Sequence, residues 1–376
     1  MNLRLLILFL LFPLLTKAQT TLNQGLRHNG INRTYILYIP ASYSDQEAVP
    51  LLFNFHGYTS NANAQMVYGD FRSISDTAGF IIVHPQGTLD AEGKTHFNVG
   101  WGGSNTDDVG FTDLLLDSLL ANYNIDESRV YSTGMSNGGY MSYYLACQLG
   151  DRIAAVASVT GSMTPLQYNG CSPTHPTPVL QIHGTQDNVV PINGANWTRS
   201  IDDVIQYWVT HNNCDETPEI SALPNTNATD QSTVEHIVYK NGDNGVQTEY
   251  FKVTGGRHTW PGSAIPSTGT NYDIDASEEV WKFFSRYDIN GLRSTTSSKE
   301  LNPYQVNIYP NPASTFLLIT TDHAGTKSYQ LLDVLGKEKF SGSFSTNSFQ
   351  INLSALTKGL YFLKIGKQYY KILKEN

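Results

Sequence analysis

The residues best suited to chemistry lie in a glycine-rich segment near the middle of the chain. Residues 130–139 read Val-Tyr-Ser-Thr-Gly-Met-Ser-Asn-Gly-Gly, so a strand-like run leads into a Gly-x-Ser-x-Gly turn. Such a turn between a strand and a helix exposes the serine hydroxyl on bent backbone, and the glycines keep other side chains away from it. A surface turn can spell the same pattern by chance. Two later segments make Ser136 the candidate nucleophile.

Each later segment presents one partner that a serine nucleophile needs. The apolar run 178–182 leads into a polar turn that ends at Asp187, and glycines bracket His258. A serine hydroxyl is a poor nucleophile at neutral pH, so an imidazole must take up its proton and a carboxylate must orient that imidazole. We therefore predict a triad of Ser136, Asp187 and His258, in the chain order that α/β-hydrolases use. His183 is assigned a structural role in its strand.

A tetrahedral intermediate also needs two donors for its negatively charged oxygen. The backbone amide of Asn137, directly after the nucleophile, is the first candidate. Residues 50–58 form an apolar run that ends in His-Gly-Tyr, so the amide of Tyr58 is the second. A glycine after a strand is common, but its place upstream of the elbow favours an oxyanion hole.

Together these motifs resemble the polyhydroxybutyrate depolymerase and feruloyl esterase family of α/β-hydrolases. The resemblance covers about Leu26 to Tyr287. The segments that carry it are Trp101-Gly102-Gly103 and residues 107–111, 134–139, 183–187 and 258–262. It implies a secreted serine esterase that forms an acyl-enzyme, needs no cofactor and cuts esters in polymers or their fragments. The triad carries over onto Ser136, Asp187 and His258, whereas the identity of the ester does not.

The expected substrates are plant cell-wall polysaccharide esters, such as feruloyl or acetyl groups on xylan. Tyr58, Trp101, Trp197 and Trp260 lie near the motifs, and aromatic rings stack on sugars and on phenolic acyl groups. Of these, Trp101, Trp197 and Trp260 are predicted to contact the substrate. Packing inside the core is the competing role for at least half of these aromatics. A polyhydroxybutyrate depolymerase is the alternative chemistry. A non-catalytic polymer-binding protein on the same fold is the alternative of another class, and the intact triad argues against it.

The first eighteen residues read as a secretory signal peptide. Arg4 precedes an apolar run over residues 5–15, which is too short for a membrane helix, and no later stretch is long enough to span a bilayer. We therefore expect a secreted or cell-surface protein. Ten of the 24 Lys and Arg and five of the 33 Asp and Glu follow Gly291, so fourteen basic residues face 28 acidic ones before that point. This balance argues against nucleic acid as a partner.

Three cysteines allow at most one disulfide. We predict a Cys171–Cys214 bridge, because both lie in polar, loop-like surroundings, and a buried free thiol at Cys147 on the helix after the elbow. No Cys-x-x-Cys spacing is present, so no metal site is expected. Asp107 and Asp108 precede a predicted helix and are expected to cap it rather than to bind a metal.

Strand-like and helical patterns alternate between residues 19 and 291, which predicts an α/β fold with a doubly wound, mostly parallel sheet. The strand-like runs are 34–39, 50–55, 80–83, 129–132, 154–159 and 178–182, and the helical runs are 111–120, 138–149, 201–211 and 276–287. Residues 292–303 lack periodic apolar positions and read as a linker. Residues 304–376 alternate with turn signals, which predicts a small β-sandwich.

A carbohydrate-binding module would fit a small C-terminal β-sandwich. However, Tyr309-Pro310-Asn311-Pro312 and the segments 333–337 and 371–374 closely resemble the C-terminal sorting domain of the Por (type nine) secretion pathway of Bacteroidota. That resemblance implies that the secretion machinery is a partner of this domain. The domain is then expected to act as a signal for export and to have no catalytic role.

Overall fold

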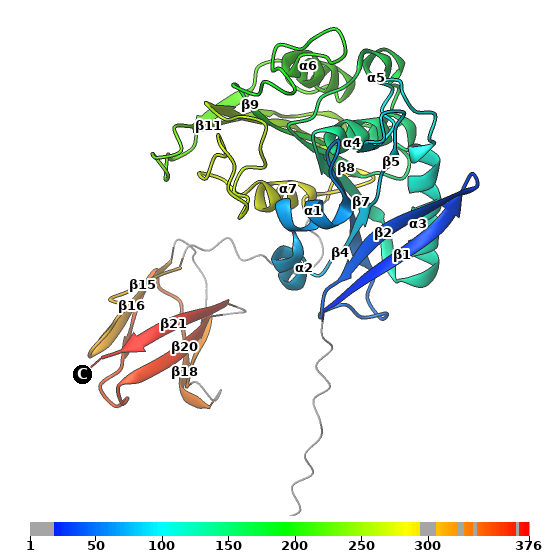
Figure 1. The fold of residues 1–376 in the computed structure, drawn as a ribbon. Helices are drawn as coiled ribbons and strands as arrows, with labels where there is room; N and C mark the ends of the chain where they lie inside the picture. The colour runs from blue at the N-terminus through cyan, green and yellow to red at the C-terminus, as the bar shows by residue number, and fades with distance from the viewer. Residues whose placement is uncertain (1–18, 294–305, 322–326, 334–336, 366–367, 376) are drawn as a thin grey trace, which may run out of the picture. The chain divides into compact units, whose positions relative to one another are not determined.

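The computed structural model describes residues 19–293, 306–321, 327–333, 337–365 and 368–375 (Figure 1). The chain divides into two compact units, Met1–Arg293 and Ser294–Asn376. The predicted signal peptide and residues 294–303 of the predicted linker lie outside the described residues. Among the described residues, no helix is long and apolar enough to cross a membrane.

The first unit is built on a ten-stranded sheet with the order β1-β2-β4-β3-β7-β8-β9-β12-β11-β10. In this order, neighbouring strands from β4 to β12 are parallel. Antiparallel strands flank them at both edges, β2 and β1 beside β4, and β11 and β10 beside β12. The bounds are β1 Thr20–His28, β2 Ile31–Ile39, β3 Val49–Phe55, β4 Ile81–Pro85, β7 Ile125–Met135, β8 Ala155–Val159, β9 Val179–Gly184, β10 Glu219–Ala222, β11 Thr233–Tyr239 and β12 Thr248–Thr254. The predicted α/β fold with a doubly wound, mostly parallel sheet is thereby confirmed, although the sequence patterns had missed β1 and β10 to β12.

Helices cover both faces of this sheet. They are α1 Ala62–Tyr68, α2 Arg72–Ala78, α3 Asp108–Asn122, α4 Asn137–Gln148, α5 Pro165–Gly170, α6 Ile201–His211 and α7 Ala276–Phe284, with a 3₁₀ turn at Asp243–Gly245. Two short hairpins, β5 Thr88–Leu89 with β6 Thr95–His96 and β13 Tyr287–Asp288 with β14 Gly291–Leu292, complete the unit.

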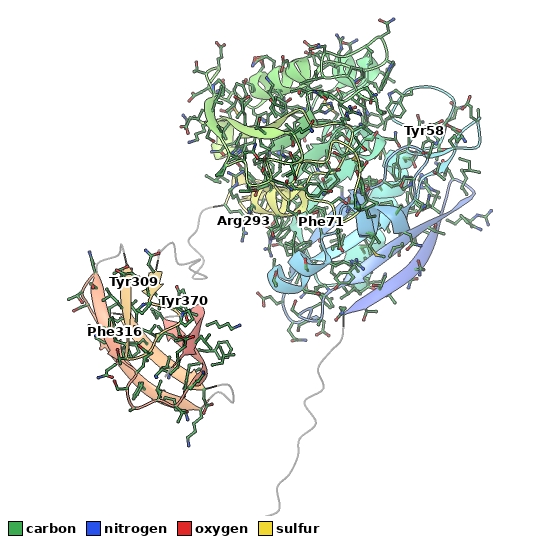
Figure 2. The ribbon with its side chains drawn as sticks, turned by 60° about the vertical axis from the view of Figure 1, so that its left-hand side comes forward. Tyr58, Phe71, Arg293, Tyr309, Phe316 and Tyr370 are labelled. Carbon is green, nitrogen blue, oxygen red and sulfur yellow. A yellow bond between two sulfur atoms is a disulfide. The ribbon has the colours of Figure 1, made fainter. Side chains whose placement is uncertain are left out.

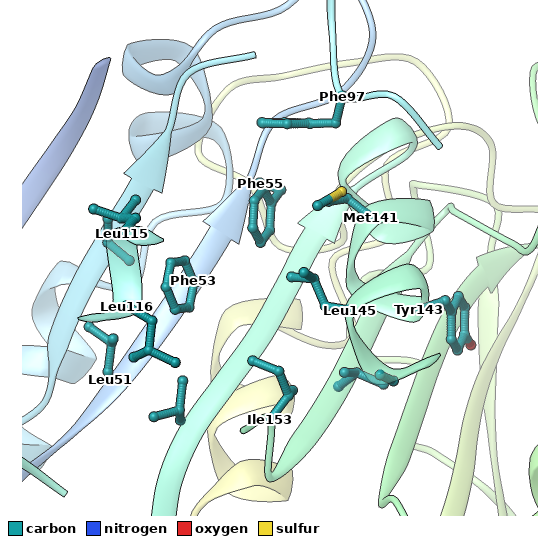
Figure 3. Close-up of a cluster of buried hydrophobic side chains, with 14 of the residues drawn as sticks. Leu51, Phe53, Phe55, Phe97, Leu115, Leu116, Met141, Tyr143, Leu145 and Ile153 are labelled. Carbon is teal, nitrogen blue, oxygen red and sulfur yellow. The ribbon is translucent and has the colours of Figure 1, made fainter. Parts of the chain in front are cut away.

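Successive residues of a strand point to opposite faces of a sheet, and β3 shows how this builds two cores. Leu51, Phe53 and Phe55 pack in a cluster with residues of α3 and α4 (Figure 3). The intervening Leu52 packs in a second cluster with residues of α7. Every residue of β3 is buried, as expected of a central parallel strand with helices on both sides. The central strands of the sheet are therefore held between two packed layers.

The second unit contains two small antiparallel sheets, as predicted. One has the order β15-β16-β19 and the other β18-β17-β20-β21. The bounds are β15 Val306–Tyr309, β16 Phe316–Thr321, β17 Lys327–Asp333, β18 Glu338–Phe344, β19 Ser348–Asn352, β20 Gly359–Ile365 and β21 Gln368–Lys374. Both sheets contribute to one core, for example Leu317 and Leu363. The Asn311 side chain donates to Lys371 O at 2.7 Å and accepts from Leu373 N at 2.9 Å, so it pairs with the open edge of β21.

Candidate active site

The three predicted triad residues follow the ends of strands that run in the same direction. Ser136 follows β7, Asp187 lies three residues after β9, and His258 lies four residues after β12. Hydrogen bonds join neighbouring strand ends, from Ser136 N to Val159 O at 2.8 Å and from Thr185 N to Val253 O at 2.9 Å. The carboxyl ends of parallel strands meet at one edge of a sheet, where α/β proteins form their sites.

Ser136 has the backbone conformation of a nucleophile elbow. Its φ is 52° and its ψ is −117°, which are strained values for a residue other than glycine. A Cβ at Gly138 would lie 2.1 Å from Phe55 O, and one at Gly134 would lie 2.6 Å from the carbonyl carbon of Gly138. The two glycines of the motif are therefore required by the close approach of β3, β7 and α4.

Asp187 and His258 form a short, well-supported hydrogen bond. His258 Nδ1 lies 2.7 Å from Asp187 Oδ2. The other carboxylate oxygen of Asp187 accepts from the backbone amides of Val189 at 2.9 Å and Val190 at 2.8 Å. Burial raises the pKa of Asp187, but His258, through its hydrogen bond and charge, outweighs it together with His183 and the Val190 amide, so the net pKa lies below the usual value. An ionised Asp187 holds the proton of His258 on Nδ1 and leaves Nε2 to accept another.

His183 lies close to this pair but is committed to other partners. Its Nε2 donates to Val190 O at 2.9 Å, and its Nδ1 accepts from the Gln181 side chain at 3.1 Å. Burial lowers the pKa of His183 to about 4, so the ring is neutral at physiological pH. Its Nε2 is 3.5 Å from Asp187 Oδ2. Because Val190 also binds Asp187, His183 supports the turn that carries the carboxylate, which fits its predicted structural role.

The segment that carries the second predicted oxyanion donor lies beside the nucleophile. A Cβ at Gly57 would be 3.5 Å from Ser136 Cβ. The turn is fixed by His56, whose Nδ1 donates to Gly57 O at 2.7 Å and whose Nε2 accepts from Gly87 N at 3.0 Å. Burial lowers the pKa of His56 to about 4, which keeps this ring neutral. Gly57, the residue before Tyr58, therefore lies beside the elbow, where Asn137 begins α4, and the Tyr58 amide stays a predicted donor.

The predicted substrate aromatics separate into two groups. The prediction that Trp260 contacts the substrate is wrong. Its side chain is only 1% exposed, packs in the core beside α7 and donates from Nε1 to Ser277 Oγ at 3.1 Å. Trp101 and Trp197 instead approach each other with ring centroids 5.8 Å apart, and Trp197 is 41% exposed. Tyr58 lies edge-on to Trp101 with a centroid distance of 6.5 Å, and its exposed ring is labelled in Figure 2.

We call Tyr58, Trp101 and Trp197 the aromatic cluster. Its buried base is Tyr140 of α4, whose centroid is 4.9 Å from that of Trp101. The sequence analysis did not predict a role for Tyr140, although this residue lies four positions after the nucleophile, one helical turn from it. The cluster therefore adjoins the elbow through α4.

The disulfide prediction is wrong. Cys147 is bonded to Cys171, and Cys214 is a buried free cysteine. Cys147 lies near the end of α4, and Cys171 directly follows α5, whose chain returns to that end of α4. Cys214 is enclosed beside Gly242, where an added Cβ would lie 2.9 Å from its sulfur. Burial raises the pKa of the Cys214 thiol.

Asp107 and Asp108, at the beginning of α3, have separate roles. Asp107 caps the helix by accepting from Gly110 N at 2.8 Å, as predicted. Asp108 is instead buried in an ion pair with Arg33. Among the described residues, no group of three or more His, Cys, Asp or Glu side chains is placed to hold a metal ion.

Comparison with known proteins gives matches for both units. Residues 307–375 match the family model of the secretion system C-terminal sorting domain, and residues 110–216 match that of the phospholipase/carboxylesterase family. The sorting-domain match indicates that the protein is secreted or held at the cell surface, as predicted.

Several esterases resemble this chain. A bifunctional acetylxylan esterase/xylanase of Neocallimastix patriciarum is 26% identical over 280 residues, which cover 74% of this chain and 37% of that protein. Feruloyl esterase B of Piromyces equi is 29% identical over 242 residues, 60% of this chain and 42% of that protein. Feruloyl esterase D of Neurospora crassa is 28% identical over 272 residues, which cover 69% of this chain and 84% of that protein. The chain thus spans about two fifths of the length of the first two relatives.

Among solved structures, an acetyl xylan esterase from Aspergillus awamori aligns with a TM-score of 0.49 and 16% identity, covering 70% of this chain and 98% of that one.

Proposed function

We propose that this chain, whose first unit is an α/β-hydrolase similar to feruloyl and acetylxylan esterases, is a secreted serine carboxylic ester hydrolase. The observation that carries the proposal is the 2.7 Å contact between Asp187 and His258 at the sheet edge that also carries the strained Ser136. A serine, an imidazole and a buried carboxylate in this order are the components of acyl transfer through a covalent intermediate.

In the proposed reaction, Ser136 Oγ attacks the ester carbonyl while His258 Nε2 takes up the hydroxyl proton. Asp187 stabilises the resulting imidazolium. The carbonyl oxygen gains negative charge, and the amides of Asn137 and Tyr58 donate to it. His258 then returns the proton to the departing alcohol, which leaves an acyl group on Ser136. Water then attacks this acyl group while His258 takes up one of its protons, and His258 returns that proton to Ser136 Oγ as the acid leaves.

The proposed substrates are feruloyl or acetyl esters of plant cell-wall polysaccharides. Two observations support this class: the named relatives act on such esters, and exposed aromatic rings adjoin the elbow. Trp101 and Trp197 would stack on a sugar ring or on a phenolic acyl group. No specific observation favours polyhydroxybutyrate as the substrate. A purely polymer-binding role would leave the Asp187–His258 pair and the strained serine without a use.

A substrate panel tests this proposal. Wild-type protein and Ser136→Ala would be compared on ethyl ferulate, acetylated xylan and hydroxybutyrate oligomers. We expect release of ferulate or acetate by the wild type and none above background by the variant. Turnover of hydroxybutyrate oligomers alone would contradict the substrate class, and equal hydrolysis by both proteins would contradict the enzyme itself.

The second unit is proposed to contact the secretion machinery during export. Its match to the sorting-domain model and its separate core support this role.

A further inference from the structure

The side chain of Asn137 holds the main chain of a distant loop. Its Oδ1 accepts from Phe97 N at 2.7 Å, and its Nδ2 donates to Phe97 O at 3.0 Å. Both residues are fully buried, and they lie 40 positions apart in the chain. Two hydrogen bonds from one planar amide fix both the position and the orientation of the groups they join. We call this pair of bonds the Asn137–Phe97 clamp.

Phe97 also contacts the other half of the predicted oxyanion hole. Its ring centroid is 4.6 Å from that of His56, and His56 donates to Gly57 O. Gly57 directly precedes Tyr58, the second predicted donor. Phe97 therefore touches both donor segments: its main chain binds the side chain of Asn137, and its ring packs on the residue that fixes the turn before Tyr58.

The loop that begins at Phe97 is itself anchored. Asn98 N donates to Asp108 Oδ2 at 2.7 Å, and the Asn98 side chain donates to Thr106 O at 2.9 Å. Asp108 is paired with buried Arg33. Because these hydrogen bonds and the ion pair hold the far end of the loop, the clamp connects the elbow to an anchored segment. The same loop carries Trp101 of the aromatic cluster.

We propose that the Asn137 side chain is a positioning residue that sets the geometry of the oxyanion hole. This inference rests on the proposed function. As the first residue of α4, Asn137 has a backbone N–H without an intrahelical partner, and that N–H is the predicted donor. The clamp restrains the residue that carries this N–H and, through Phe97, keeps it in register with the Tyr58 amide. A displacement of less than 1 Å weakens such a donor, because its effect depends on preorganisation.

The chain offers a matched control in Asn212, which forms the same pair of bonds at a distant place. Its Oδ1 accepts from Thr177 N at 2.8 Å, and its Nδ2 donates to Thr177 O at 2.7 Å. Asn212 is fully buried, and it follows α6 near the beginning of β9, at the opposite end of the strand from Asp187. Asn137→Ala and Asn212→Ala therefore remove the same kind of clamp inside and outside the site.

The experiment measures kcat and KM on p-nitrophenyl acetate and the rate at which a fluorophosphonate probe labels Ser136, together with thermal unfolding. We expect both variants to unfold at lower temperature, since each leaves a buried backbone N–H and C=O, of Phe97 or of Thr177, without these hydrogen-bond partners. Asn137→Ala should lower kcat and the labelling rate by about 10- to 100-fold with little change in KM, because a misplaced donor affects the transition state. Asn212→Ala should keep both rates within about twofold of wild type.

Asn137→Asp serves if the alanine variant does not fold. It preserves the size of the side chain and the bond from Phe97 N, but places a second acceptor against Phe97 O, so the same loss of kcat is expected. Wild-type rates in a folded Asn137 variant, or an equal loss in Asn212→Ala, would overturn the inference. A wrong substrate class would leave it intact, since both readouts use small reagents. Failure of wild-type Ser136 to react with either reagent would contradict the proposed function together with this inference.

Discussion

Oδ2 of Asp187 lies 2.7 Å from Nδ1 of His258, although the two residues are 71 positions apart. The contact exists because β12 pairs in parallel with β9, while β10 and β11, which intervene in the chain, are placed outside β12 at the edge of the sheet. The carboxylate and the imidazole are therefore delivered to one edge by two adjacent strands.

Replacement of Ser136 by alanine should remove ester hydrolysis while preserving the fold. We expect a loss in kcat of about six orders of magnitude, as in other triads that act as a unit. The melting temperature should not fall, because only the hydroxyl is removed and the strained backbone remains. Turnover of p-nitrophenyl acetate and thermal unfolding measure the two effects. Retained turnover would show that the nucleophile lies elsewhere.

The two histidines near Asp187 should behave differently when replaced by alanine. His258→Ala should lower kcat almost as much as Ser136→Ala, because it removes the base. His183→Ala should mainly lower the free energy of unfolding, because the ring is buried between Val190 O and the Gln181 side chain. Kinetics corrected for the folded fraction distinguish these effects. An essential His183 together with a dispensable His258 would mean that the base is misassigned.

Acid should destabilise the first unit in a pH range that buried histidines set. The pKa of His183 is lowered from 6.5 to about 4 by burial. Between these values the unfolded chain binds a proton that the folded protein does not, so stability falls as the pH drops from about 6.5 to about 4. The full effect is about 3 kcal/mol, since one pKa unit corresponds to about 1.4 kcal/mol. His56 acts in the same direction.

Urea unfolding of wild type and His183→Gln at several pH values checks this range. The free energy of unfolding of the variant should depend less steeply on pH between 6.5 and 4. Parallel curves for the two proteins would show that His183 does not contribute to the acid sensitivity.

The Cys147–Cys171 disulfide should stabilise the first unit. It closes a loop with a sequence separation of 24, for which the loss of unfolded-state entropy is worth about 3 kcal/mol. Peptide mapping without reduction should recover these two cysteines in one linked peptide and leave Cys214 unmodified by alkylating reagents until unfolding. The double variant Cys147→Ser/Cys171→Ser should unfold at lower urea concentration. A linked peptide that contains Cys214 would refute the pairing.

Removal of residues 304–376 should abolish export without changing catalysis. The second unit has a core of its own, so we expect the first unit to fold without it. Esterase kinetics on a soluble ester should match wild type, while the truncated protein should stay in the periplasm of its host. Activity on insoluble xylan is the discriminating measurement. Its loss in a truncated protein that still reaches the medium would identify the second unit as a binding module.

The sequence by itself predicted the type of chemistry and the order of the residues proposed to carry it out. The Gly-x-Ser-x-Gly turn requires glycines where backbones meet, and that local requirement is visible in residues 134–138. The buried runs of the parallel strands and the alternating pattern of the second unit are likewise local signals. These patterns predicted both fold classes and brought Ser136, Asp187 and His258 forward as candidates.

Tertiary structure decided every feature that depends on which distant segments become neighbours. Trp260 and Trp197 are the same residue type in polar surroundings, yet one is buried against α7 and the other is exposed beside Trp101. The partner of Cys171 is Cys147 because α5 folds back onto the end of α4. The Asn137–Phe97 clamp has no sequence signature at all. Burial and pairing arise when nonlocal packing selects one set of neighbours, and the spacing of residues along a chain does not encode that selection.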